Sequence, residues 1–141
     1  RKVPVALTTY GSFPAAMVSL SYERDTFISK FENTIGYLLD SLEYLTIAEI
    51  CDVVSRRSAG LCASGLVAIL KRISCPDGVI AADGSMFKLH PFFMSYVTNY
   101  MKEMIPDNRK FEILPVDDGS GKGAALAACV ASAEQQKTQP A

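Results

Sequence analysis

Three glycines and a lysine stand close together in the segment Asp117-Asp118-Gly119-Ser120-Gly121-Lys122-Gly123. An apolar run at 111–116 precedes this segment and a run of small residues at 124–131 follows it, an order typical of strand, glycine loop and helix. Glycine lets the backbone turn sharply and approach a ligand or another helix closely. The free N–H groups that open the following helix could bind a phosphate. The glycine spacing matches neither a P-loop nor the dinucleotide fingerprint, so a tight turn before a closely packed helix is the alternative interpretation.

A second glycine turn, Asp83-Gly84-Ser85, follows the apolar run Val79-Ile80-Ala81-Ala82. This run predicts a short, fully buried strand. Open α/β sheets bind ligands beyond the carboxyl ends of their strands, which is where both glycine turns fall. The turns therefore mark one candidate binding edge. We interpret Asp83 and Asp118 as turn residues that bond to their own backbone, rather than as catalytic carboxylates.

Helices are predicted around these strands. Apolar spacing indicates one helix from about Asp25, as its N-cap, to Leu42, and a second from Thr46 to about Ile73. The pattern Thr46-x-x-Glu49 fits a capping box for the second helix. A third helix is expected from Pro91 until Pro106. Residues 1–22 are expected to form loop with at most a brief strand, and 134–141 a frayed polar tail.

The second predicted helix is rich in small residues. Gly60 and Gly65 each weaken a helix, which suggests that another backbone approaches it closely there. Arg56 and Arg57 are expected to be solvated or salt-bridged. The expected buried face comprises Ile47, Ile50, Val54, Ser58, Leu61, Gly65 and Ile69.

Composition excludes several classes of function. The chain of 141 residues has 14 Lys and Arg against 15 Asp and Glu, which gives no basic face, so nucleic acid is not expected as a partner. The longest apolar stretch, residues 66–70, is too short to span a bilayer, and no secretory signal pattern is present.

The cysteines and the histidine offer little metal or nucleophile chemistry. None of the four cysteines forms a C-x-x-C pair, which argues against a zinc site. Cys62 and Cys129 are expected to be buried thiols, which fits a reducing compartment and a cytoplasmic location. His90 is the single histidine, so it would have to carry any Cys-His or Ser-His system.

Three motifs taken together closely resemble the C-terminal part of the large, ATP-binding domain of eukaryotic hexokinases. They are SRRSAGLCASGL at 55–66, ADGSMFKLHP at 82–91 and DGSGKGAAL at 118–126. The resemblance is dense over 51–131 and weaker but collinear over 13–45. It implies an α/β fold of the actin-like ATPase (ribonuclease H-like) type, with an incomplete sheet and flanking helices over residues 1–133.

The resemblance also implies where ATP would bind. Hexokinases hold the adenosine and phosphates of ATP with a strand and turn like 80–89, and this role transfers to Gly84, Ser85, Met86, Phe87, Lys88 and Leu89. Gly119 and Ser120 belong to the second turn, which resembles the family's last connecting helix and could serve packing and hinge motion as much as ATP. A family Thr-x-x-x-Ser contact aligns with Ser19, although Ala15 replaces the threonine.

The implied parent enzyme transfers the γ-phosphoryl group of ATP, bound with Mg²⁺, to the 6-hydroxyl of glucose or a related hexose. Nothing in this sequence matches the family's sugar site or catalytic aspartate, so we expect ATP or ADP as partner and no turnover by these residues alone. Two alternatives stay open at this point: a non-catalytic hexokinase-like segment kept for binding or regulation, and an α/β interaction domain that binds no nucleotide.

Overall fold

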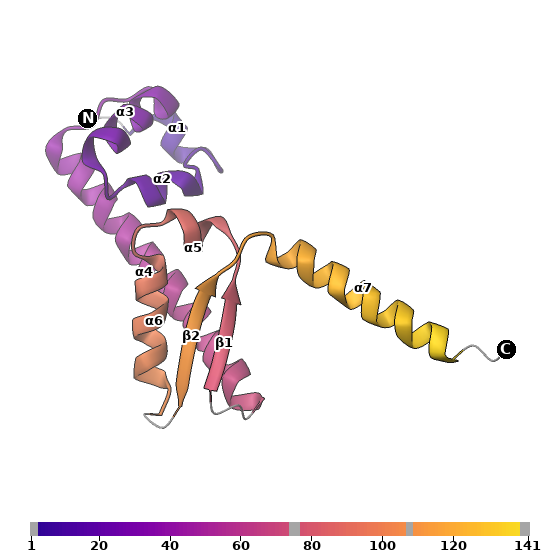
Figure 1. Cartoon of the computed structure of the whole chain (residues 1–141). Coiled ribbons are helices and arrows are strands. Elements are labelled where there is room, and N and C mark those ends of the chain that lie inside the picture. The colour runs from indigo at the N-terminus through magenta and orange to yellow at the C-terminus, as the bar shows by residue number, and fades with distance from the viewer. Residues whose placement is uncertain (1–2, 74–76, 107–108, 139–141) are drawn as a thin grey trace.

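The computed structural model describes residues 3–73, 77–106 and 109–138, and the side chains within that range as far as residue 132. Short N-terminal helices gather at one end of a long helix, which packs with a second helix against a small sheet (Figure 1). The elements are α1 Val5–Thr8, α2 Ala15–Leu20, α3 Arg24–Ile35, α4 Ser41–Arg72, β1 Asp77–Ala82, α5 Ser85–Leu89, α6 Phe93–Met104, β2 Lys110–Pro115 and α7 Gly119–Thr138.

The two strands pair in parallel, with Asp77 opposite Lys110 and Ala82 opposite Pro115. The α/β class and the predicted strand positions are confirmed. Ile80 of β1 and Ile113 of β2 pack toward the core that α4 and α6 form. Val79 is 69% exposed on the other face, so the prediction of a fully buried strand is wrong for β1.

The close packing of α6 on α4 forms the main core. Ala59 and Ala63 of α4 are fully buried against Val97 and Met101 of α6. Small side chains on α4 let the bulkier side chains of α6 approach, and alanines make this contact. The close backbone approach expected at Gly60 and Gly65 is not found there. A Cβ on Gly65 would meet nothing within 4 Å, and one on Gly60 would lie 3.8 Å from the Tyr100 ring.

The predicted buried face of α4 is wrong. Ile50, Leu61 and Ile69 lie on the exposed side of the helix, between 57% and 64% exposed. Apolar residues surround most of α4, so periodicity alone permits two faces, and the face with smaller residues packs against α6. The residues buried along α4 are Tyr44, Cys51, Ser55, Ala59, Ala63, Val67 and Leu70.

By length and composition α4 could cross a bilayer, alone among the described helices. This differs from the sequence-based expectation, which considered only uninterrupted apolar runs. A core helix of a globular domain meets the same criterion. Because α4 packs against α6, we assign it to the core.

α4 begins earlier than predicted. The Asp40 carboxylate accepts hydrogen bonds from the N–H groups of Leu42 and Glu43 at 3.0 and 2.9 Å, and the Glu43 carboxylate accepts one from Asp40 N at 2.9 Å. This is a complete capping box. The Thr46 hydroxyl instead donates to the Leu42 carbonyl at 2.9 Å within the helix.

α3 is correspondingly shorter than predicted, because Gly36 ends it in a left-handed conformation with φ of 71°. Its N-cap is Glu23 rather than Asp25. The loop predicted for residues 1–22 contains α1 and α2, which begin directly after Pro4 and Pro14. The proline before each helix fixes a backbone φ angle that suits helix entry. A second core, Met17, Phe27, Phe31, Ile35, Leu39 and Tyr44, joins these helices to α4.

α7 extends away from the rest of the fold (Figure 1). It begins at Gly119, so the glycines occupy its first turns rather than a loop before it, and it continues to Thr138 within the expected tail. Residues 139–141 of that tail lie outside the described part. Cys129 on α7 is exposed and Cys62 on α4 is half-buried, so neither is the buried thiol expected. Cys75 lies outside the described residues.

The N-cap assignment of α4 can be tested by substitution. Asp40→Ala should lower the free energy of unfolding by about 1 kcal/mol, because two N–H groups lose their acceptor. Thr46→Ala should change it by less than about 0.5 kcal/mol, because alanine favours the helix interior. Urea denaturation followed by circular dichroism measures both, and a larger loss for Thr46→Ala would contradict the assignment.

The packing of α4 predicts opposite effects on stability for two substitutions. Gly65→Ala should stabilise the chain by roughly 0.5–1 kcal/mol, since the added methyl group meets open space and alanine favours the helix. Ala63→Leu should destabilise it by roughly 1–3 kcal/mol, because a fully buried position cannot take three more carbons. Thermal or urea unfolding of the two variants measures this, and equal effects would contradict the assigned face.

Candidate functional site

The two glycine turns lie side by side at the carboxyl end of the sheet. Val116 N donates to the Ala82 carbonyl at 3.0 Å, and Gly119 N donates to Asp83 Oδ2 at 3.0 Å. A Cβ on Gly119 would lie 3.3 Å from Asp83 Cβ and 2.9 Å from Val116 Cγ2. The close approach of the two turns therefore requires glycine at position 119. This geometry favours the packing interpretation of the second turn.

Lys88 is shared by two carboxylates. Its Nζ lies 2.8 Å from Asp117 Oδ1 and 3.0 Å from Asp83 Oδ1. The ion pairs with Asp117 and Asp83 raise the pKa of Lys88, and the bond from Lys88 lowers the pKa of Asp83. Asp83 thus links two turns distant in sequence, which corrects the prediction that it bonds only to its own backbone.

Gly84 directs the chain from β1 into α5. Its φ of 131° and ψ of 154° belong to a region that residues with a Cβ avoid. The chain turns there and places Ser85 at the start of α5, beside a cavity.

A cavity of about 530 Å³ lies between α2 and α5. Four of the predicted site residues line it together: Ser19, Ser85, Met86 and Leu89. They come from segments more than 60 positions apart, so the fold brings them together. The other lining residues are Ala15, Ala16, Leu20, Glu23 and Pro91.

The remaining predicted residues lie elsewhere. Phe87 packs edge-on against Phe93, with ring centroids 5.2 Å apart, and so faces the core. Gly84, Lys88, Gly119 and Ser120 are not among the lining residues. The sequence analysis did not identify Glu23. Its four-residue spacing from Ser19, which itself follows Ala15 by four residues, could have indicated it.

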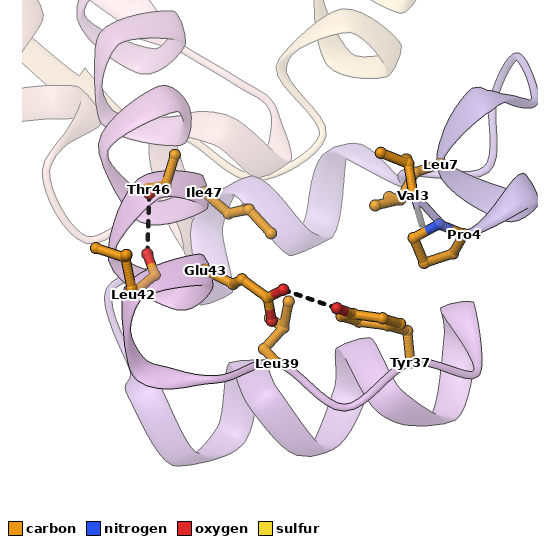
Figure 2. Close-up of a pocket in the computed structure, with 9 residues that line it drawn as sticks. All are labelled: Val3, Pro4, Leu7, Tyr37, Leu39, Leu42, Glu43, Thr46 and Ile47. Atoms are coloured by element: carbon orange, nitrogen blue, oxygen red, sulfur yellow. Dashed lines mark hydrogen bonds between the residues drawn. The ribbon is translucent and has the colours of Figure 1, made fainter. Parts of the chain in front are cut away.

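A second hollow of about 330 Å³ lies between the N-terminal segment and the start of α4 (Figure 2). Its walls are mainly apolar, among them Leu7 and Ile47. The Tyr37 hydroxyl donates to Glu43 Oε1 at 2.7 Å across this hollow, and Glu43 also completes the α4 capping box. These polar groups therefore serve local structure, and we assign no chemistry to the hollow.

The sequence profile of the hexokinase family matches residues 3–130. A hexokinase of Brugia malayi is 39% identical over 127 residues, which is 86% of this chain and 22% of the relative. Hexokinase type 1 of Drosophila melanogaster is 38% identical over 89 residues, 63% of this chain and 19% of the relative. The chain thus spans about a fifth of the length of these relatives.

Solved structures agree with the sequence comparisons. The hexokinase of Schistosoma mansoni, determined in complex with glucose, superposes with a TM-score of 0.78 at 25% identity over 88% of this chain and 29% of that one. A further hexokinase structure shares the fold with a TM-score of 0.72 at 21% identity, over 84% of this chain and 29% of that one. The paired strand ends and glycine turns described above therefore belong to an actin-like ATPase fold, and the chain is a member of the hexokinase family.

Proposed function

We propose that this chain forms the adenine-nucleotide-binding part of a hexokinase, and that the complete enzyme transfers the γ-phosphoryl group of ATP to the 6-hydroxyl of glucose or a related hexose. The cavity between α2 and α5, lined by Ser19, Ser85, Met86 and Leu89, is the observation that carries this proposal. Family membership supports the reaction class. The Schistosoma mansoni relative, solved with glucose, supports the sugar.

The cavity suits an adenosine group. Its volume falls within the usual range of ligand sites, and apolar side chains make up most of its lining. Met86, Leu89 and Leu20 offer surface to the faces of a purine. The Ser19 and Ser85 hydroxyls and the Glu23 carboxylate offer hydrogen bonds to a ribose.

The phosphates would lie toward the edge formed by Gly84 and Gly119. Ser85, which lines the cavity, follows Gly84 directly, and Gly119 is bonded to Asp83. Lys88 and Lys122 both place an ammonium group at this edge. A phosphate must compete for Lys88 with Asp83 and Asp117, while Lys122 Nζ donates to the Asp117 carbonyl at 2.8 Å. Mg²⁺, entering with ATP, would supply further positive charge to the phosphates.

We further propose that these residues alone do not phosphorylate glucose. Phosphoryl transfer requires both reactants held in line and a base on the sugar hydroxyl. The described residues form one wall of such a site. The rest of a hexokinase chain would supply the sugar contacts and that base, and a coupled assay showing turnover by this chain alone would overturn the proposal.

Nucleotide binding can be tested with two matched leucines. Leu89→Asp should weaken ATP–Mg binding about tenfold or more, because a carboxylate would enter an apolar wall next to the nucleotide. Leu126→Asp on α7 is the control, since Leu126 is similarly exposed, 68% against 74%, and does not line the cavity. Backbone amide NMR shifts measured during an ATP–Mg titration report both affinities. No shift at Ser19 or Ser85 in the wild-type chain at saturating ATP–Mg would refute the assignment.

The contact between the turns predicts a pH dependence. The Lys88 ion pair lowers the pKa of Asp83 below its ordinary value of 3.8. The contribution of ionised Asp83 to stability is therefore fully present above pH 3.8 and is lost as the pH falls through the lowered pKa. Asp83→Asn should therefore destabilise the chain most above about pH 4, and the difference from wild type should shrink as the pH falls through the lowered pKa of Asp83. Denaturant unfolding at a series of pH values measures this.

The same substitution in a Lys88→Met background serves as the control. The effect of Asp83→Asn should be smaller there, because only the charge-assisted bonds from the Gly119 and Ser120 N–H groups are left to weaken. An equal effect in both backgrounds would show that Lys88 does not share in the contact.

A further inference from the structure

A buried polar cluster lies beside the proposed nucleotide cavity and contains the single histidine of the chain. His90, in the turn between α5 and α6, is 4% exposed, and Ser55 on α4 is 1% exposed. His90 Nε2 lies 2.9 Å from Ser55 Oγ. The Ser55 hydroxyl donates to the Cys51 carbonyl at 2.8 Å, so its proton is engaged and this pair is not a Ser-His nucleophile.

The hydrogen bonds of His90 define its protonation state. Phe92 N donates to Nδ1 at 3.2 Å, so Nδ1 must carry a lone pair. Nε2 then carries the proton and donates to Ser55 Oγ, whose own proton goes to Cys51. Every donor in this chain of bonds has an acceptor. Adding a proton at Nδ1 would point two N–H groups at each other and break the bond to Phe92, which is the N-cap residue of α6.

Charged and titratable groups face His90 from each neighbouring element. Asp52 on α4 accepts hydrogen bonds from the Tyr22 hydroxyl at 2.9 Å, the Tyr96 hydroxyl at 2.7 Å and Arg56 Nε at 2.7 Å. Burial raises the pKa values of Tyr22 and of Tyr96 on α6, so both phenols stay protonated as donors. Burial also opposes ionisation of Asp52, but the three donors outweigh it and lower its pKa. The Arg56 guanidinium stacks over the Tyr96 ring at 4.6 Å. Cys51 is a further titratable group on α4, and burial raises the pKa of its thiol.

The cluster joins the two walls of the cavity. Tyr22 stands in sequence between Leu20 and Glu23, which line one wall, and its ring packs edge-on against His90 at a centroid distance of 5.1 Å. His90 stands between Leu89 and Pro91, which line the other wall. Tyr22 bonds to Asp52 and His90 bonds to Ser55, so both walls are attached to α4.

We propose that His90 is a positioning residue for this cavity: its neutral form, protonated at Nε2, holds the α2 wall and the α5 wall together on α4, and its protonation releases them. The consequence for nucleotide affinity rests on the proposed function. The attachment of the two walls to α4 through His90, which we call the joint, is a property of the chain and can be measured without a nucleotide.

The pKa of His90 supports this role. Burial lowers it from the ordinary 6.5, and the charge of Asp52 opposes part of that change. The unfolded chain therefore binds a proton at a higher pH than the folded chain. The contribution of His90 to stability is fully present above about pH 6.5 and is lost as the pH falls from there toward the lowered value.

The first test uses the imidazole ¹⁵N signals of the 141-residue chain, which need no assignment because the chain has one histidine. We expect an unprotonated Nδ1 and a protonated Nε2 at pH 7.5. On acidification, the amide signals of Ser19, Ser85 and Leu89 should shift with the midpoint of the His90 signals. The opposite tautomer, titration without movement of both walls, or global unfolding before His90 is protonated would each overturn the proposal.

The second test measures ADP binding against pH in the wild type and in His90→Gln, whose amide can donate to Ser55 but does not titrate. One pH unit below the His90 midpoint, wild-type affinity should fall about tenfold further than that of His90→Gln, because only a tenth of the chains hold the joint closed. If His90→Gln fails to fold, Tyr22→Phe provides the test instead. This variant keeps the ring contact with His90 and loses the hydrogen bond to Asp52, so the His90 titration midpoint should rise. The proposed role of His90 would be overturned if ADP affinity had the same pH dependence in wild type and His90→Gln, or if the His90 midpoint were unchanged in Tyr22→Phe. Wall movement without any ADP binding would overturn only the nucleotide assignment.

Discussion

The close packing of α6 on the alanines of α4 is the constraint from which the site follows. α6 connects β1 to β2, and its contact with Ala59 and Ala63 returns the chain so that the second strand lies parallel to the first. Parallel neighbours end at the same edge, which brings the two glycine turns together. The contact between Asp83 and Gly119 then closes an arrangement that helix packing has already set.

The sequence predicted those elements whose signals have a single interpretation. The positions of the strands before Asp83 and Asp117, the turn at Gly84 and the end of α4 near Ile73 were predicted correctly. The start of α4 was wrong because Asp40…Glu43 and Thr46…Glu49 both fit a capping box, and only tertiary contacts choose between them. Its buried face was wrong because apolar residues such as Ile50 and Leu61 also lie on the side away from α6.

The candidate site was predicted in part, for a comparable reason. Ser85, Met86 and Leu89 follow a recognisable turn, so family resemblance locates them. Whether Ser19 lines the same cavity depends on the position of α2, which we expected to be loop. Lys88 pairs with Asp83 and Asp117 because the turns meet, a relation that no local pattern reveals. The same applies to Ser55 and His90, which lie 35 positions apart.

The uncovered surfaces of the fold affect how the chain behaves in solution. Val79 on the sheet, Ile69 on α4 and Val130 on α7 are all more than half exposed, and each described strand has one unpaired edge. Such edges and apolar surfaces attract further copies of a chain. We therefore expect the chain to self-associate as its concentration rises.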